Sequence, residues 1–173
     1  MFNIYLIGSV LGQFAVHVGT LIYISNYVAQ FEEYALSCEF VDFRPEAKPD
    51  LEAQFKPSLL NSAIYLVQLI QQVSTFAINY QGRPFRESIR ENRSMWWSII
   101  GVAAIAFACS IEFIPELNEK LRLVKFTPEF QQTLTLTMIV DYGGCWLIEQ
   151  GFKLAFSDNK PKAIAIRNKK KNE

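Results

Sequence analysis

Residues 76–85 read Phe76-Ala-Ile-Asn-Tyr-Gln-Gly-Arg-Pro-Phe85, and they close an apolar run that begins near Ser58. Gly82 and Pro84 continue a helix poorly, so the predicted helix stops just before them. Four arginines then follow within the eleven residues from Arg83 to Arg93. A long apolar helix that ends in aromatic residues and is followed by arginines is typical of a membrane span that leaves the bilayer on its cytosolic side.

Long stretches without charge define the predicted fold. The sequence has no Asp, Glu, Lys or Arg in 1–31, 57–82 and 94–111, and has one, Asp141, in 130–148. At about 1.5 Å per helical residue, runs of this length reach the roughly 30 Å of a hydrocarbon core. The prediction is an all-α, polytopic membrane protein with four transmembrane helices. They are expected at about 2–24, 58–80, 95–112 and 130–149.

A soluble four-helix bundle is the main alternative, because an apolar content of 50% is normal for soluble proteins. A chain of 173 residues cannot bury four helices on every side, so each would need a charged outer face. The four runs lack such a face, which favours the membrane. The formal net charge of zero gives no reason to expect a nucleic-acid partner.

The charge of the connecting segments changes sign with each crossing. Segment 26–57 has seven acids and three bases, a net charge of −4, and segment 112–129 has four acids and three bases, a net charge of −1. Segment 81–93 has four bases and two acids (+2), and segment 149–173 has seven bases and three acids (+4). Because basic loops stay in the cytosol, both termini are predicted to be cytosolic.

The first predicted span carries small and polar residues on neighbouring faces. The motif Gly8-Ser-Val-Leu-Gly12 continues at Gly19, and small residues at this spacing let another helix approach closely. Gln13 and His17 lie four residues apart, and we interpret them as interhelical hydrogen-bonding residues. A proton relay is the alternative.

The second predicted span has a continuous polar stripe, with Gln71 beside it. Lipid offers such side chains no partners, so the stripe must face other helices or a wet cavity. It is either polar contact between helices or the lining of a path for a polar or amphipathic substrate. Its members are Asn61, Gln68, Gln72, Thr75 and Asn79.

Asp141 lies near the middle of the fourth predicted span, where a carboxylate costs roughly 2.5–3.5 kcal/mol to insert. It shares a face with Thr137, Gly144 and Cys145. An interhelical hydrogen bond, a cation ligand or a cavity-facing site would each account for it. The chain has one histidine, three cysteines and no CxxC spacing, so no metal site is predicted.

The basic tail ends with Lys170 and Lys171 in fourth and third place from the C-terminus. This resembles the dilysine retrieval signal of endoplasmic-reticulum membrane proteins, and it indicates a multi-pass protein of that membrane. Simple anchoring to anionic lipids is the alternative.

Several segments together resemble the C-terminal membrane region of type V-A P-type ATPases, which are pumps of the endoplasmic reticulum. The resemblance runs from residue 2 to about 156 and implies that the four spans are the seventh to tenth helices of a ten-helix pump. Residues 1–156 would be its membrane support domain, and 157–173 a basic cytosolic tail. The matching segments are Phe2-Asn-Ile-Tyr, Gln13-Phe-Ala-Val-His17, Phe55-Lys-Pro-Ser-Leu-Leu-Asn61-Ser, Phe76–Phe85 and Glu91-Asn92.

The resemblance implies ATP-driven extraction of mistargeted transmembrane helices from the membrane. The expected partners are the lipid bilayer, the remaining pump helices and cytosolic domains, and transmembrane-helix substrates. The phosphorylation motif Asp-Lys-Thr-Gly-Thr and the dephosphorylation motif Thr-Gly-Glu-Ser are absent from the sequence. We therefore expect no catalytic residue and no cofactor in this chain, and ATP and Mg²⁺ only in a full-length pump of which it is a C-terminal portion.

Two other functions stay open at this point. One is an autonomous four-span scaffold or assembly protein. The other is a small transporter that uses Asp141 as its coupling site.

Overall fold

The computed structural model describes residues 4–38, 57–80 and 87–156, and every regular element in them is a helix. The all-α prediction is thus confirmed for the described part of the chain. The elements are α1 (Ile4–Cys38), α2 (Leu59–Asn79), α3 (Arg93–Ser110), the short α4 (Pro115–Lys120) and α5 (Pro128–Ala155).

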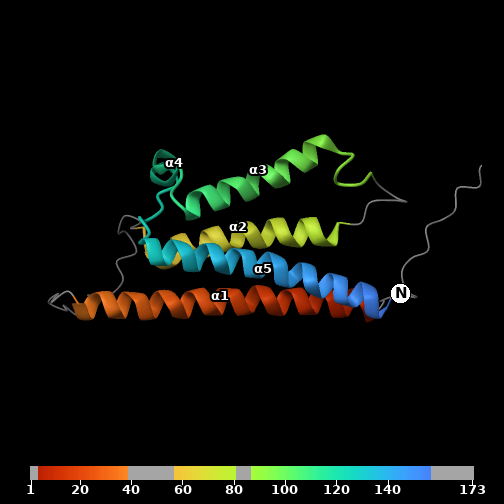
Figure 1. Cartoon of the computed structure of the whole chain (residues 1–173), viewed down its shortest axis with the longest axis horizontal. Helices are drawn as coiled ribbons and strands as arrows, with labels where there is room; N and C mark the ends of the chain where they lie inside the picture. The colour runs from red at the N-terminus through yellow and green to blue at the C-terminus, as the bar shows by residue number, and fades with distance from the viewer. Residues whose placement is uncertain (1–3, 39–56, 81–86, 157–173) are drawn as a thin grey trace, which may run out of the picture.

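The four long helices lie beside one another and alternate in direction (Figure 1). Helix α1 packs along α5 and α2, α2 also packs on α5 and α3, and α3 lies at the edge of the bundle. The end of α1 and the starts of α2 and α5 lie at the end of the bundle that carries α4. Four successive membrane crossings would give this order, and the side that faces the cytosol stays a prediction.

Three of the long helices begin at a side chain that caps them. Ser58, Asn92 and Thr127 have extended backbones, and the side-chain oxygen of each accepts a hydrogen bond from the backbone N–H three residues later. Such a bond satisfies one of the free N–H groups at a helix start. Pro128 follows Thr127 in the first turn of α5, where its missing N–H removes no bond.

The helices differ in length from the predicted spans in an informative way. Helix α2 matches the predicted 58–80 to within a residue at each end, whereas α1 continues to Cys38, far beyond residue 24. Charged residues end an apolar run without ending a helix, so α1 runs through Glu32 and Glu33. For the same reason α5 continues past Glu149, the last residue of the predicted span 130–149, to Ala155.

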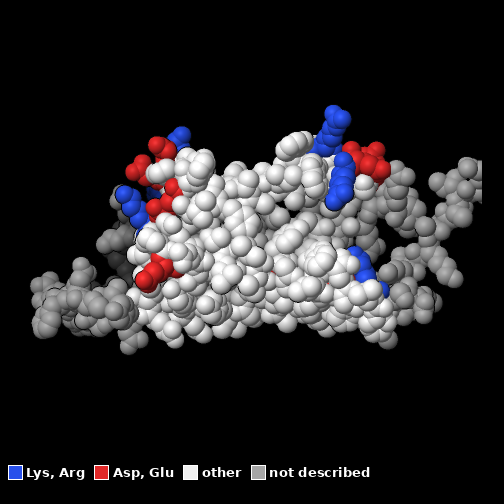
Figure 2. Space-filling model, viewed as in Figure 1, with Lys and Arg blue, Asp and Glu red and all other residues white. Residues whose placement is uncertain are grey.

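An uncharged belt lies between two charged ends. On the face drawn in Figure 2, the described Lys, Arg, Asp and Glu side chains gather at the ends of the helices. Two helical segments, Tyr5–Phe31 and Arg93–Ser110, are long and apolar enough to cross a membrane. Helices α2 and α5 have 21 and 28 residues, but amides and acids lower their hydropathy. Their crossing stays a prediction.

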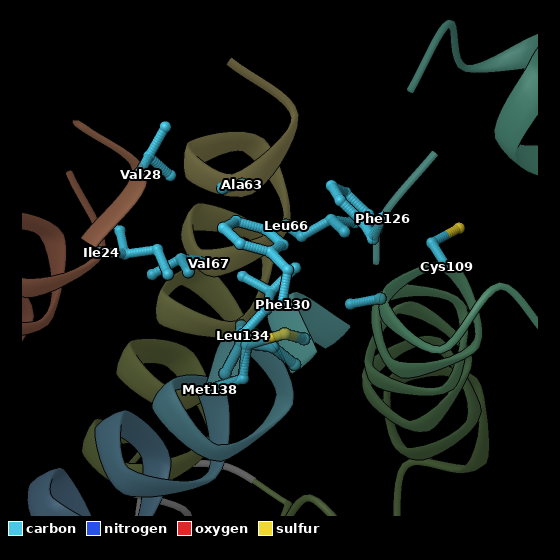
Figure 3. Close-up of a cluster of buried hydrophobic side chains, with 12 residues drawn as sticks. Ile24, Val28, Ala63, Leu66, Val67, Cys109, Phe126, Phe130, Leu134 and Met138 are labelled. Atoms are coloured by element: carbon cyan, nitrogen blue, oxygen red, sulfur yellow. The ribbon is translucent and has the colours of Figure 1, made fainter. Parts of the chain in front are cut away.

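The apolar core fills the end of the bundle near α4 (Figure 3). Phe130 is fully buried there, and its ring lies 5.4 Å from that of Phe126 and 5.8 Å from those of Tyr27 and Phe31. The fully buried members of this core have less than 2% exposure. They include Ile24, Val28, Ala63, Leu66, Val67, Ile70, Leu134 and Met138.

Candidate functional site

A buried carboxylate joins three helices at the centre of the bundle. Asp141 of α5 is 0% exposed. Thr20 of α1 donates to its Oδ1 at 2.7 Å, and Gln71 of α2 donates to the same oxygen at 3.2 Å. The Nδ1 of His17 lies 3.0 Å from both carboxylate oxygens. The cost of burying this side chain is thus offset by donors from two other helices.

His17 stands between this carboxylate and the outside of the bundle. Its Nε2 lies 3.0 Å from the hydroxyl oxygen of Thr75 on α2, and the Sγ of Cys145 lies 3.7 Å from both ring nitrogens. Its side chain is 14% exposed, whereas that of Asp141 is 0% exposed. The ring therefore links the buried carboxylate to the exposed Thr75 at the surface of the bundle.

His17, Asp141 and Cys145 also bring three metal-ligand types together, with one ligand atom of each within 4.8 Å of the others. Imidazole, thiolate and carboxylate are ligands that Zn²⁺ and similar divalent ions accept. The sequence predicted no metal site because the chain has one histidine and no CxxC spacing, and His17 lies far along the chain from Asp141 and Cys145. The fold places them on facing sides of α1 and α5.

A pair of amides forms a second link between α1 and α2. Gln13 donates to Asn79 Oδ1 at 3.1 Å, and Asn79 donates to Gln13 Oε1 at 2.7 Å. Gln13 also donates to the hydroxyl of Ser9 at 2.9 Å. Two reciprocal hydrogen bonds fix both the distance and the register of the two helices.

Glu149 is the second buried acid of α5, at 6% exposure, and the sequence-based prediction missed it. The hydroxyl groups of Tyr5 and Ser9 donate to its two oxygens, and the Nζ of Lys153 lies 3.1 Å from Oε1. Its position eight residues after Asp141, two turns along one helical face, is the signal that could have revealed it. On α1, polar residues recur every fourth position from Tyr5 to His17.

Small residues let α1 and α5 approach closely, as the glycine motif of α1 predicted. A Cβ added at Gly8 would lie 2.4 Å from the ring of Phe152, and one at Gly12 would lie 2.9 Å from Ile148. At Gly19 nothing lies within 4 Å, so the close approach covers the first two glycines only.

A groove of about 1130 Å³ separates the exposed sides of α1 and α2. Its polar wall contains four of the five residues of the predicted stripe, Gln68, Gln72, Thr75 and Asn79, together with His17 and Gln71. Its apolar wall is formed by Leu6, Phe14, Val18, Leu21, Phe76 and Tyr80. The groove is therefore amphipathic along its length.

Asn61, the fifth residue of the stripe, is not part of this groove. It lies at the start of α2, in a separate pocket that Tyr65 and Arg122 also line. Lys170 and Lys171 fall outside the described residues, as do Gly82 and Pro84.

The fold and the buried polar clusters together define the class of protein. Helices with an uncharged belt, two buried carboxylates and interhelical amide bonds make up a helical membrane protein. No protein-family model matches the chain.

Individual relatives identify the chain more closely. It is 60% identical over 167 residues to the endoplasmic reticulum transmembrane helix translocase of Aspergillus fumigatus, which covers 96% of this chain. It is 57% identical over 168 residues to the translocase of the same name from Schizosaccharomyces pombe, covering 97% of the chain. A probable manganese-transporting ATPase of Arabidopsis thaliana is 31% identical over 179 residues.

These similarities confirm the resemblance to the membrane region of a type V-A P-type ATPase, and they confirm the endoplasmic-reticulum membrane as the location. The chain spans only 12–14% of the length of these relatives.

Proposed function

We propose that this chain forms the C-terminal membrane region of an ATP-driven P-type translocase that extracts mistargeted transmembrane helices from the endoplasmic reticulum. Identity of 57–60% over nearly the whole chain to two proteins named as such translocases is the observation that carries the proposal. ATP and Mg²⁺ act in the remainder of the pump, since these 173 residues contain no phosphorylation motif.

Within such a pump, the described helices would act mainly as a rigid support. The Asp141 and Glu149 clusters tie α5 to α1, and the Gln13–Asn79 pair ties α1 to α2. Hydrogen bonds of this kind fix helix positions in a medium that offers no competing donors. The other pump helices, which undergo the movements of transport, would move against this unit.

The groove between α1 and α2 is the surface of this unit that suits a substrate. A mistargeted transmembrane helix is mostly apolar but carries polar groups, and the groove offers one wall of each kind. Gln68 and Gln72 are exposed on its polar wall, and no hydrogen bond to either side chain is found among the described residues. They are the residues we assign to substrate contact, whereas Asp141 positions the wall from behind.

The experiment compares substrate-stimulated ATP turnover in the full-length pump reconstituted in vesicles. Replacing Gln72 by Leu removes a hydrogen bond of about 1 kcal/mol to the substrate, so the apparent substrate affinity should fall roughly fivefold. Gln68→Leu should act in the same direction. Gln132→Leu is the matched control, because Gln132 is exposed on α5 away from the groove.

Asp141→Asn tests the positioning role in the same assay. The amide retains one acceptor oxygen but cannot accept from every present donor, so the wall should loosen and stimulated turnover should fall. Normal stimulated turnover in Gln68→Leu, Gln72→Leu and Asp141→Asn, at normal expression, would refute the proposed role of the groove.

Cation transport is the second candidate function. It is favoured by the proximity of His17, Asp141 and Cys145 and by the name of the Arabidopsis relative. Three hydrogen-bonding groups already contact the Asp141 carboxylate, which leaves less of it free to bind a cation. Cation transport is therefore the weaker candidate. Stimulation of ATP turnover by a divalent cation that disappears in Cys145→Ser would support cation transport. ATP turnover that changes neither on addition of the cation nor in Cys145→Ser would exclude it.

A further inference from the structure

A second cavity, of about 540 Å³, lies between α2, α3 and α5, away from the substrate groove. We call it the α2–α3–α5 slot. It exists because α3 is fastened to α5 near one end, where Ser110 and Thr135 hydroxyl oxygens lie 3.1 Å apart. Toward Arg93 the two helices diverge (Figure 1).

The walls of the slot are apolar and its size suits a ligand. Branched side chains of all three helices line it, including Ile70, Val73, Ile99, Ile100 and Ile139. A volume of 540 Å³ falls within the range of about 300–1,000 Å³ of small-molecule sites. The space is partly open to the surface of the bundle, so an acyl chain can enter it and contact apolar side chains of three helices.

Small residues keep the slot open. Ala77, Ala103 and Gly143 line it, one from each helix. A Cβ added at Gly143 would meet nothing within 4 Å. Larger residues at these positions would close the space without disturbing the contacts that α5 makes with α1.

One end of the slot carries a positive charge. Arg90 is the basic residue of its lining, and its guanidinium carbon lies 5.9 Å from the centre of the Trp96 ring. Trp96 is itself part of the lining, and tryptophan favours the boundary between lipid tails and headgroups. Glu87 and Glu91 are in the same segment, and the Glu91 carboxylate accepts a hydrogen bond from the Ser88 N–H.

We infer that the α2–α3–α5 slot binds an anionic phospholipid, with an acyl chain between the helices and its headgroup beside Arg90. Charge complementarity identifies this occupant. The apolar walls face the hydrocarbon, and the cation lies at the headgroup level beside an interfacial tryptophan. Among the described residues no acid lines the slot, so the charge of Arg90 is not offset within its lining.

The test is native mass spectrometry of the full-length protein that carries this chain, extracted from vesicles of phosphatidylserine and phosphatidylcholine. The wild type should retain phosphatidylserine. Gly143→Leu should reduce retention roughly tenfold, because its side chain displaces about two methylene groups of the lipid from the slot. Gly101→Leu is the matched control, since its Cβ also meets nothing within 4 Å and it lies outside the slot lining.

Arg90→Gln separates the headgroup from the chain. It should lower the preference for phosphatidylserine over phosphatidylcholine roughly fivefold while a lipid is still retained. Equal lipid retention in Gly143→Leu and Gly101→Leu would overturn the inference. So would retention without any preference between the two lipids, or a wild type that retains none because a protein segment fills the slot. None of these outcomes depends on ATP turnover, so the proposed function is tested separately.

Discussion

The same three helices are held together in two different ways along their length. Near α4, buried apolar side chains such as Phe130 and Met138 pack without a polar partner. Only three residues after Met138, α5 turns Asp141 into the bundle, and from there to Glu149 the contacts with α1 and α2 are largely hydrogen bonds. We call these the apolar half and the polar half.

The two halves contribute differently to a bundle in a membrane. Lipid tails are as apolar as Leu, so apolar contacts there gain only from close packing and carry little information about register. Hydrogen bonds between helices have defined geometry and no solvent to replace them. Because many fully buried side chains pack closely in the apolar half, we expect it to supply most of the stability, and the polar half to fix the alignment of α1, α2 and α5.

The largest expected effect comes from the apolar half. Phe130→Ala should lower the free energy of unfolding by about 3–5 kcal/mol, because it leaves a cavity among the Tyr27, Phe31 and Phe126 rings. Phe113→Ala, at a residue with 74% exposure, should change it little. The measurement is reversible unfolding in detergent mixtures. A similar decrease in the free energy of unfolding in Phe130→Ala and Phe113→Ala would show that the apolar core does not stabilise the bundle.

The polar half should show a smaller loss of stability and a larger loss of alignment. Asp141→Ala removes three interhelical partners, and at about 0.6 kcal/mol for each hydrogen bond the loss is about 2 kcal/mol. Chemical crosslinking of cysteines placed at Val16 and Gly144, where a Cβ on Gly144 would lie 3.2 Å from Val16, would report on the register of α1 and α5. The yield should fall in Asp141→Ala and persist in Phe130→Ala at temperatures where both are folded. The reverse order would contradict the division between the halves.

A third comparison lies within α1 itself. Gly19→Ala should stabilise the protein by about 1 kcal/mol, since alanine favours a helix and its Cβ meets nothing within 4 Å. Gly12→Ala has the same helix gain, but its Cβ would lie 2.9 Å from Ile148, so repacking should cancel about 1 kcal/mol of it. Thermal unfolding of the two variants measures the difference. An equal gain in stability in Gly19→Ala and Gly12→Ala would mean that the close approach of α1 and α5 at Gly12 does not contribute to stability.

Much of the fold could be predicted from the absence of charge. Three uncharged runs and a fourth with a single acid, Asp141, predicted four long helices. The bounds of α2 were accurate because its uncharged run begins near Ser58 and because Gly82 and Pro84 follow its end. The lengths of α1 and α5 could not be found this way. A charged residue marks the limit of an apolar run, whereas a helix ends only where its backbone bonds end.

The candidate site was predictable in its residues but not in its connections. Asp141, His17 and Gln13 drew attention because polar groups are costly in lipid, and that cost does not depend on the fold. Their hydrogen-bonding partners depend on which helix faces meet in the fold, and the sequence does not show this. Gln71, for example, lay beside the predicted stripe, but in the structure it donates a hydrogen bond to Asp141. Glu149 was missed because its place at the end of an uncharged run resembles a membrane boundary.

The smallest effect concerns the connection between α3 and α5 at the apolar end. Glu112 and Arg122 have φ of 52° and 53°, a region that favours glycine, and each ends a helix with a bond across the turn, from Phe113 to Ala108 and from Leu123 to Asn118. Arg122→Gly should relieve about 1–2 kcal/mol of strain against about 0.5–1 kcal/mol of lost backbone entropy, a net gain of about 0.5–1 kcal/mol.

Glu112→Gly is the matched variant that separates backbone strain from side-chain contact. The Glu112 carboxylate accepts a hydrogen bond from the Phe126 N–H at 2.6 Å and so joins the end of α3 to the segment before α5. A charge-assisted bond of this kind is worth about 1.5–3 kcal/mol, which exceeds the strain relieved. The midpoint temperature of thermal unfolding should therefore rise slightly for Arg122→Gly and fall for Glu112→Gly. A rise in both would mean that the apolar half packs without this connection.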